Sequence, residues 1–481
     1  EGNTATRVRE KTGLTLIEHV MQTPRARLTI REFMLRAGRE LNAYAPCFLM
    51  TPSSVADFLP KDFQFDLLII DEASQMLTEE ATGAILRANQ VLVVGDSQQM
   101  PPSNLMASRL DAPEDDPDVK NESILDRASL CLGKKRSLLY HYRSRHESLI
   151  QFSNAEFYNN ELRLIPSPQE KSDRLGVRHI ELDAIYQPGR AAHESAQPNP
   201  VEAKQVVEDV CAFMLNPENR DRSLGVAALN IRQSQRIDAL LAERFEADAA
   251  LNAYLDHWKD TKEYFFVKNL ENVQGDERDV IFVATVFGKT AEGKVPQNFG
   301  INKSGDEKRI NVLVTRAKEQ LQIYSSLKPN QITSSSRGPQ VLKGYLDYAA
   351  NGRLPESAEK TANRESKGSP LADWLAARMA KDDFQTIRDL GSGDMKIDLV
   401  VRSTDGARGY VCGIVLDGPA YYESEYTLER DCLRQKVLRS HGWSLIQVWT
   451  VDFLADPEAA YLALKSKIDA ANYAHSDFIA S

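Results

Sequence analysis

The sequence has few cysteines and no long apolar run. Its five cysteines are scattered, without the Cys-x-x-Cys spacing or paired histidines of a zinc site, so we expect neither a zinc site nor a disulfide framework. No apolar run approaches the roughly 20 residues that cross a bilayer, and the first residues, EGNTATR, lack the apolar core of a secretory signal. These absences predict a protein of the reducing cytoplasm with no membrane partner. An initiating Met is also missing, which indicates a natural start upstream.

An excess of positive charge is absent too. The chain has 59 Lys and Arg against 69 Asp and Glu, a formal net charge of −10. Such a chain repels polyanions as a whole, so a nucleic-acid partner must be held by a locally basic or hydrogen-bonding groove. With 481 residues, 42% of them hydrophobic and 27% charged, the composition is that of a globular protein of about three domains.

Alternating strand and helix patterns predict an α/β protein, with parallel sheets covered by helices on both faces. A helical stretch is expected at 233–262, a solvated loop at 111–118 (DAPEDDPD) and a polar linker at about 351–367. The apolar strand candidates are residues 66–70, 91–94, 224–229, 280–286, 310–314 and 321–325.

Five short motifs stand in a fixed order along the chain. A nucleotide-driven motor needs a phosphate cradle, a carboxylate pair for magnesium and water, and arginines that contact the γ-phosphate. The motifs supply everything except the cradle, because the sequence has no Gly-x-x-x-x-Gly-Lys-Ser/Thr stretch. They are residues 67–75 (LLIIDEASQ), 94–102 (VGDSQQMPP), 141–145 (HYRSR), 273–277 (VQGDE) and 311–317 (NVLVTRA).

The first two motifs carry candidate catalytic groups. Asp71 and Glu72 directly follow a predicted buried strand, where an open α/β sheet usually binds its ligand. There Asp71 would hold Mg²⁺ through water, and Glu72 would polarise the attacking water. Gln99 precedes two prolines, which put its amide on a rigid turn able to sense the γ-phosphate. The alternatives are an ordinary strand end for the carboxylates and a turn fixed by prolines for Gln99.

The remaining motifs supply arginines and a glycine turn. Arg143, Arg145 and Arg316 are candidates for the phosphate, because the planar guanidinium grips phosphate oxygens bidentately and stays charged. We expect Arg316 at the end of the strand 310–314, and surface salt bridging is the alternative for all three. Glu277 is a candidate acceptor for a ribose hydroxyl, with Gly275 letting the backbone approach a ligand. A plain turn before a strand is the alternative there.

Together the motifs resemble superfamily 1 helicases of the Asp-Glu-Ala-Ser-Gln branch, over about residues 40–345. The resemblance implies two RecA-like parallel-sheet lobes, the first one incomplete, at residues 1–135 and 136–348, with a helical insertion near 233–262. It implies ATP and Mg²⁺ as cofactors and assigns Asp71 and Glu72 to the Walker B element. The other implied roles are coupling for Gln99, γ-phosphate contact for Arg143 and Arg316, nucleotide contact for Gln274, Gly275 and Glu277, and nucleic-acid backbone contact for Thr51 and Ser53.

A second resemblance follows the expected linker 349–368. Two strand patterns carry Asp398 and Asp417, which could share one metal, although a strand cap and an Asp-Gly turn are the alternatives. Residues 369–481 resemble restriction-endonuclease-like domains related to very-short-patch repair nucleases. The chain departs from that family at Ala372, at Val415 and at Tyr421-Tyr422.

Val415 offers no oxygen where the family has a carboxylate, so the resemblance implies a degenerate nuclease that binds DNA more readily than it cuts. Arg430 and Arg434 are the candidate DNA contacts, since they recur with Lys436 and Arg439 at helical spacing. A solvated helix face is the alternative explanation for such a run.

The leading hypothesis is the C-terminal portion of a DNA helicase, an ATPase that translocates on DNA, joined to a nuclease-fold DNA-binding domain and acting in genome defence or repair. Without the phosphate cradle, we expect this segment alone not to hydrolyse ATP. A non-catalytic DNA-binding scaffold and an active helicase-nuclease are the alternatives. The expected partner is single-stranded DNA, or duplex with a single-stranded region. RNA is the alternative to DNA as the nucleic acid along which the protein moves. Other defence or repair proteins are further candidate partners.

Overall fold

The computed structural model divides into two compact units, residues 1–136 and 137–481, each of which is described by itself. The expected α/β class is confirmed, because the chain forms a five-stranded parallel sheet and a separate C-terminal sheet. The structure describes residues 7–23, 27–102, 123–169, 172–188, 197–354, 369–391, 395–403, 409–422 and 426–480. The predicted loop 111–118 lies outside these ranges.

The N-terminal unit, residues 1–136, is built on two parallel strands, β1 (Phe65–Ile70) and β2 (Ala88–Val93). Both strands were predicted from their near-continuous apolar residues. One face packs under helices, but the other leaves Leu67, Ile69 and Leu92 half exposed, which is unusual for parallel strands. The helices are α1 (Gly13–Gln22), α2 (Ile30–Tyr44), α3 (Pro52–Phe58), α4 (Thr78–Ile85) and α5 (Ile124–Cys131), with 3-10 turns at Val8–Glu10 and Ala73–Gln75.

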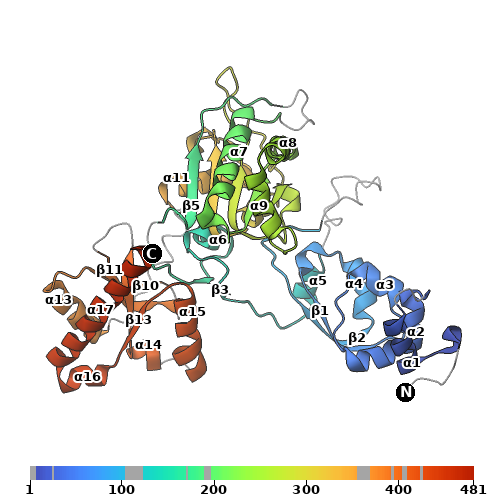
Figure 1. The fold of residues 1–481 in the computed structure, drawn as a ribbon, viewed down its shortest axis with the longest axis horizontal. Helices are drawn as coiled ribbons and strands as arrows, with labels where there is room; N and C mark the ends of the chain where they lie inside the picture. Colours follow the sequence, from blue (N-terminus) through green and yellow to red (C-terminus); the bar gives the residue numbers. More distant parts are fainter. Residues whose placement is uncertain are drawn as a thin grey trace. The chain divides into compact units, whose positions relative to one another are not determined.

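The second lobe, residues 137–354, contains the five-stranded parallel sheet, in the order β5-β9-β8-β6-β7. Helices α7, α8 and α9 lie on one side of this sheet and α11 lies on the other (Figure 1). The strands are β5 (Gly176–Glu181), β6 (Leu224–Ala228), β7 (Phe266–Asn269), β8 (Arg278–Ala284) and β9 (Ala317–Ser325), and β3 (Tyr140–His141) pairs separately with β4 (Arg163–Leu164). The helices are α6 (Ser148–Phe157), α7 (Pro200–Leu215), α8 (Ile231–Ala247), α9 (Ala249–Trp258), α10 (Glu307–Val314) and α11 (Arg337–Asn351), with 3-10 turns at Pro217–Asn219, Leu270–Asn272 and Pro329–Gln331.

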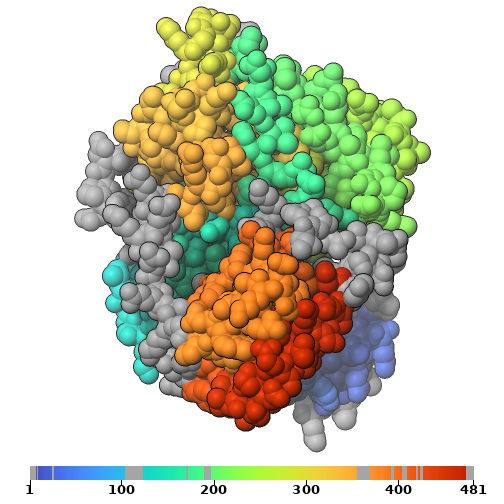
Figure 2. All heavy atoms as spheres, turned by 90° about the vertical axis from the view of Figure 1, so that its left-hand side faces the viewer, coloured from blue at the N-terminus to red at the C-terminus, as the bar shows by residue number. Residues whose placement is uncertain are grey.

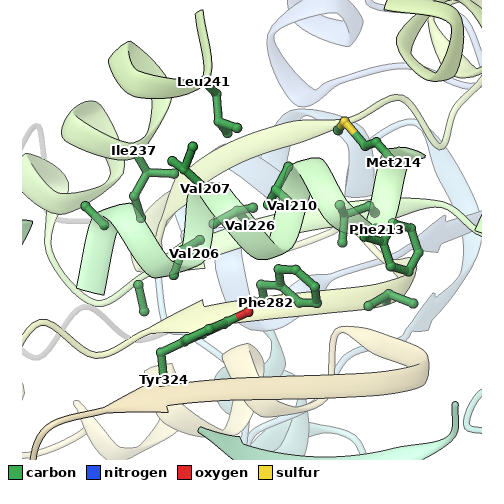
Figure 3. Packing of buried hydrophobic residues seen from close by; sticks show 14 of the residues in the cluster. Val206, Val207, Val210, Phe213, Met214, Val226, Ile237, Leu241, Phe282 and Tyr324 are labelled. Atoms are coloured by element: carbon green, nitrogen blue, oxygen red, sulfur yellow. The ribbon is translucent and has the colours of Figure 1, made fainter. Parts of the chain in front are cut away.

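The core of the second lobe lies between α7 and the sheet. Val206 and Phe213 of α7 point toward Val226 and Phe282 of the central strands, with Tyr324 beside them (Figure 3). All these side chains are at least nine-tenths buried. Burial of this kind contributes about 1.5–3 kcal/mol for each large apolar side chain, so this core fixes the strands whose ends carry the motifs.

Two expectations about this lobe have clear outcomes. The predicted strand 310–314 is wrong: these residues belong to α10, whose last five residues are all buried. A short apolar run does not distinguish a buried helix from a buried strand. The helical stretch 233–262 is confirmed as α8 and α9, which together connect β6 to β7. Helix α11 continues to Asn351, so the first three residues of the predicted linker 349–368 are helical, and residues 355–368 are not among those described.

The C-terminal domain, residues 369–480, has a four-stranded sheet in the order β10-β11-β12-β13. Its last two strands are parallel and the others antiparallel. The C-terminal helices, drawn red in Figure 2, lie against the rest of the domain, drawn orange. The strands are β10 (Thr386–Leu390), β11 (Ile397–Arg402), β12 (Tyr410–Leu416) and β13 (Leu445–Val448). The helices are α13 (Pro370–Ala380), α14 (Pro419–Tyr422), α15 (Arg434–Ser440), α16 (Thr450–Ala455) and α17 (Pro457–Ala480), with a π turn at Glu429–Leu433.

Within the described ranges, no helix combines the length and the apolarity that crossing a bilayer would require.

Candidate nucleotide and nucleic-acid site

Asp71 and Glu72 lie at the carboxyl end of β1, as the sequence predicts. The Asp71 carboxylate accepts one hydrogen bond from the Glu72 backbone N–H at 2.9 Å, and Gln75 Nε2 donates to Glu72 Oε2 at 3.1 Å. Glu72 has a left-handed backbone, with φ of 52°. Both carboxylates are exposed, so each keeps oxygen lone pairs free for water or a metal-bound ligand.

The Gln99 motif reaches the same edge of the β1–β2 pair. The Val94 N–H donates to the Ile70 carbonyl at 2.8 Å, which holds the two strand ends together. A Cβ on Gly95 would lie 3.1 Å from the backbone nitrogens of Ala73 and Ser74, so this close approach requires glycine. The Gln99 amide donates to Asp96 Oδ2 at 3.1 Å. The Gln99 motif therefore follows β2 at the same end at which Asp71 and Glu72 follow β1.

Three motifs that are far apart in sequence meet at one edge of the second lobe. Arg143 Nε lies 2.8 Å from Glu277 Oε2, and both side chains are about two-fifths exposed. The Arg278 N–H donates to the Arg316 carbonyl at 3.2 Å. Because Glu277 directly precedes β8 and Arg316 directly precedes β9, this edge lies at the amino ends of the strands.

Arg316 is placed differently from our expectation. It follows helix α10 rather than a strand and is only 4% exposed. Its Nε donates to the Val312 carbonyl at 2.8 Å, and its Nη2 donates to Thr315 Oγ1 at 3.1 Å. The carbonyls at a helix C-terminus carry partial negative charge that favours a guanidinium. Arg316 is thus anchored in its own lobe, whereas Arg143 is open to solvent.

The turn before β8 contains Gly275 and Gln274. Gly275 has a φ of 84°, but a Cβ there would meet nothing within 4 Å. The backbone conformation by itself favours glycine here, and the approach of a ligand to Gly275 remains a prediction. Gln274 is half buried, and its Nε2 has no hydrogen-bond partner among the described groups. An unsatisfied buried donor of this kind is favourable for a ligand that offers an acceptor.

The predicted nucleic-acid residues of the N-terminal unit begin a helix. Thr51 is the N-cap of α3, where its Oγ1 accepts from the Ser54 N–H at 3.3 Å. Ser53 Oγ lies 3.1 Å from the same hydroxyl, and both side chains are exposed. Sequence reasoning did not predict the capping role, although Thr followed by Pro is a common helix start, and the predicted contact with the nucleic-acid backbone remains a prediction.

The two carboxylates of the C-terminal domain are occupied by hydrogen bonds. Leu416 N–H donates to Asp398 Oδ2 at 2.9 Å, and burial raises the pKa of Asp398. Asp417 is 8% exposed, and its Oδ1 accepts from both the backbone N–H and the hydroxyl of Thr450, at 2.6 and 2.5 Å. The Tyr422 hydroxyl donates to its Oδ2 at 3.2 Å.

The surroundings of these carboxylates offer little to a metal. Leu399 pairs with Ile414, so Asp398 stands opposite Val415, which is 3% exposed. Among the residues that the structure describes, no three His, Cys, Asp or Glu side chains are grouped to hold a metal ion. The predicted sharing of one metal by Asp398 and Asp417 therefore finds no third acidic ligand in this part of the chain.

The predicted DNA-binding arginines of this domain make internal contacts. Arg430 pairs with Asp431 at 2.8 Å, and its guanidinium stacks 3.9 Å from the centre of the Tyr421 ring. Arg434 donates to the Lys396 carbonyl, and its charge opposes the rise in the pKa of Asp398. Neither guanidinium points freely to solvent, so phosphate binding would compete with these contacts.

Sequence reasoning missed two cations beside Glu277. Lys318 Nζ lies 3.6 Å from Glu277 Oε1. Arg278 is buried, and its guanidinium lies 4.6 Å from the centre of the Phe266 ring. Their sequence signal was weak, since each cation stands at the start of a strand next to an acidic residue, Asp279 in β8 and Glu319 in β9.

Comparisons with known proteins agree with this organisation. Residues 18–105 match a family model described as an AAA domain (AAA_11), and residues 120–328 match a second one (AAA_12). Residues 372–468 match the model REase_MTES_1575.

Three relatives are named as helicases. The chain is 28% identical over 447 residues to "Uncharacterized ATP-dependent helicase MG140" of Mycoplasma genitalium, covering 88% of this chain and 38% of that protein. It is 27% identical over 456 residues to the homologue from Mycoplasma pneumoniae, covering 89% of this chain and 39% of that protein. It is 21% identical over 294 residues to "Uncharacterized ATP-dependent helicase MJ0104" of Methanocaldococcus jannaschii, covering 59% and 39%. The chain thus spans about two-fifths of the length of these relatives.

A solved structure, the C-terminal domain of a possible DNA helicase from Lactobacillus, matches 43% of this chain and 96% of its own. The identity is 13% and the TM-score 0.23, too low to support an argument.

Proposed function

We propose that this homologue of ATP-dependent helicases acts in a DNA-dependent ATPase that moves along DNA. The chain carries AAA_11 and AAA_12 helicase domains, followed by a C-terminal REase_MTES_1575 domain. The observation that carries the proposal is the convergence of Arg143, Glu277 and the Arg316 backbone at one edge of the second lobe. Arg143 and Glu277 form an ion pair between two motifs that are remote in sequence, and the third motif reaches the same edge through the Arg316 carbonyl.

The residues have distinct proposed roles. Asp71 holds a Mg²⁺-bound water, and Glu72 orients the attacking water; their exposed oxygens, with one internal hydrogen bond each, suit the few protein ligands that Mg²⁺ takes. When bound, Mg²⁺ neutralises charge on the phosphates. Gln99 responds to the γ-phosphate, and Arg143 stabilises its developing charge. Arg316 either turns from its helix toward the phosphate or keeps the neighbouring backbone in place.

ATP turnover also requires a phosphate cradle. The 481 residues contain no Gly-rich cradle sequence with its lysine, and such a cradle supplies much of the binding energy for the phosphates. We therefore expect the 481-residue chain alone not to hydrolyse ATP. The cradle would come from outside this chain.

The C-terminal domain is proposed to bind DNA without cutting it. Asp398 and Asp417 accept hydrogen bonds from Leu416, Thr450 and Tyr422, which leaves few lone pairs for a metal. The pairing of a motor with a nuclease fold is the basis for proposing a setting in genome defence or repair.

The test measures ATP hydrolysis by the longest natural form of the protein, with and without single-stranded DNA. Wild type is compared with Glu72→Gln and Arg143→Ala, and Glu79→Gln on the exposed start of α4 is the matched control. DNA-stimulated hydrolysis that only the first two variants lose supports the proposal. Absence of DNA-stimulated hydrolysis in the wild type would favour the scaffold alternative, and equal hydrolysis in all four proteins would refute the roles of Glu72 and Arg143. Competition by RNA would identify the preferred nucleic acid.

A separate test addresses cutting. The wild type is expected to leave supercoiled DNA intact with Mg²⁺, whereas Val415→Glu places a carboxylate between Asp398 and Gln447 on the same sheet. Nicking by Val415→Glu alone would indicate a nuclease that lost one ligand. Nicking by the wild type would refute the proposal for this domain.

A further inference from the structure

Part of the second lobe packs against the C-terminal domain. We call residues 139–169 the docking segment. Ile165 of this segment is 4% exposed and lies in one apolar cluster with Ile397 and Trp443, with Tyr140 packed against the same cluster. The full set of buried residues in this cluster is Ile165, Met395, Ile397, Val400, Tyr410, Leu438 and Trp443. The contact is therefore a shared core between the lobe and the domain.

Two backbone carbonyls of the docking segment are held by the C-terminal domain. Trp443 Nε1 donates to the Pro166 carbonyl at 2.7 Å, and the Tyr410 N–H donates to the Pro168 carbonyl at 3.0 Å. The rings of Tyr410 and Trp443 stack, with centres 5.7 Å apart. Gly391 has a φ of 101°, and a Cβ there would lie 3.1 Å from Pro166 Cγ. Buried hydrogen bonds and close packing together give this contact one defined geometry.

The two arginines of the HYRSR motif face different parts of the protein. Arg143 Nε pairs with Glu277 Oε2 at 2.8 Å on the proposed nucleotide side. Arg145 Nη1 donates to the Ser440 carbonyl of the C-terminal domain at 2.6 Å, and its backbone N–H donates to the Lys318 carbonyl at 2.7 Å. Three consecutive residues thus connect the proposed nucleotide side to the C-terminal domain.

A histidine pair lies at this junction. His141 Nε2 is 2.8 Å from Ser144 Oγ. Burial, the charge of Arg143 and the proximity of His441 lower the pKa of His141 to about 4. Burial also lowers the pKa of His441, and the charge of Arg145 adds to this effect. Both rings are therefore neutral at neutral pH, which avoids adding cations beside two arginines.

We propose that the C-terminal domain is a positioning element of the motor. Trp443 and the Ser440 carbonyl hold the docking segment, and the docking segment orients Arg143 for the γ-phosphate. Trp443 and Arg145 are positioning residues, since Trp443 contacts the segment and Arg145 contacts Ser440, with neither assigned to the nucleotide. The role of Arg143 rests on the proposed function, whereas the docking itself does not.

The docking is tested on the 481-residue chain by amide hydrogen exchange. In Trp443→Phe, which keeps an aromatic ring but loses part of the indole and its N–H donor to Pro166, exchange at residues 140–146 is expected to rise roughly tenfold. Arg145→Gln, which leaves the C-terminal core intact, is expected to raise it roughly threefold. Trp449→Phe is the matched control, because Trp449 is half exposed and makes an edge-to-face contact with Tyr421. Unchanged exchange at 140–146 in the first two variants would overturn the docking.

The positioning is tested by ATP hydrolysis in the longest natural form. Trp443→Phe and Arg145→Gln are each expected to lower kcat roughly fivefold with KM for ATP within about twofold, because an interaction made only in the transition state is weakened. Arg145→Lys, which keeps a donor, is expected to recover part of the loss. If Arg143→Ala abolishes turnover but these variants leave kcat unchanged, the positioning proposal fails and the proposed function stands. If the wild type has no turnover, the proposed function fails, and with it the positioning role.

Discussion

The two pairs of carboxylates in this chain, Asp71 with Glu72 and Asp398 with Asp417, begin from similar sequence patterns and end in opposite environments. Asp71, Glu72 and Asp417 directly follow an apolar strand, and Asp398 lies at the start of one. The first pair is exposed and accepts one internal hydrogen bond per side chain. In the second pair, Asp398 is half-buried and accepts one from Leu416, whereas Asp417 is buried and accepts three. The burial of a carboxylate and the hydrogen-bond donors that the fold brings to it therefore differ between Asp71 or Glu72 and Asp417, although the sequence patterns are alike.

The energetic meaning of the two environments differs accordingly. A buried carboxylate that satisfies neighbouring donors stabilises the fold, and removing it leaves those donors unpaired at a cost of about 1–3 kcal/mol each. An exposed carboxylate adds little to stability, so its replacement affects only the chemistry in which it takes part. Activity and stability measurements therefore separate the two pairs.

The largest expected effect is on turnover by the exposed pair. Glu72→Gln in the longest natural form is expected to lower ATP hydrolysis roughly 100-fold or more, because the water loses its orienting base, with the melting temperature unchanged. Asp417→Asn is the matched change in the buried pair and is expected to leave turnover near the wild-type rate. Similar losses in both variants would contradict the comparison.

A large stability effect is expected in the buried pair. Asp417→Ala leaves the Thr450 N–H and hydroxyl without their acceptor, so the free energy of unfolding of the C-terminal domain should fall by about 2–4 kcal/mol. Urea unfolding followed by tryptophan fluorescence measures it. Asp469→Ala on the exposed face of α17 is the control, expected within about 0.5 kcal/mol of wild type.

The neutral histidine of the docking segment predicts a pH dependence. The pKa of His141 is about 4 in the folded protein, against an ordinary value of 6.5. The unfolded chain therefore binds more protons between these pH values, so the stabilisation is complete above pH 6.5 and is lost as pH falls toward 4. Between pH 7 and pH 5 the loss is roughly 2 kcal/mol.

The measurement compares urea midpoints of wild type and His141→Asn at both pH values. Because other groups titrate equally in the two proteins, the difference between their pH dependences isolates His141. Identical pH dependences would show that this ring titrates normally.

The smallest effect is expected for the Arg143–Glu277 pair. Both side chains are about two-fifths exposed, and exposed ion pairs contribute about 0.2–1 kcal/mol. A double-mutant cycle with Arg143→Ala and Glu277→Ala should give a coupling energy in this range. A coupling of several kcal/mol would mean that the pair is structural, like Asp417 with Thr450.

Much of the fold was predictable because its central strands are nearly continuous in apolar residues. Strands β1, β2, β6, β8 and β9 were found this way, and α10 was misassigned for the same reason. Strand β5 was missed because its sequence, GVRHIE, has only two large apolar residues, Val177 and Ile180, and they are separated by Arg178 and His179. Apolar continuity reports burial, and burial alone does not determine the backbone conformation.

The candidate site was predictable where a motif carries its own chemistry and unpredictable where the partner is remote. The motif residues Asp71, Glu72 and Glu277 could be named from spacing, although their roles remain predictions. The acceptor of Arg145 is a backbone carbonyl 295 positions away, and a carbonyl has no sequence signature. The sequence likewise did not indicate that the Thr450 N–H and hydroxyl would donate hydrogen bonds to the Asp417 carboxylate.

The shared core around Ile165 has a practical consequence for protein engineering. A chimaera or a truncation made within residues 355–368 would follow the predicted domain boundary. It would nevertheless expose Ile165 and Tyr140, because the C-terminal domain packs against them. The isolated lobe would then expose an apolar patch, which promotes self-association in solution. Constructing a well-behaved isolated lobe would call for polar replacements at these positions, and grafting a foreign domain would call for a tryptophan at the place of Trp443.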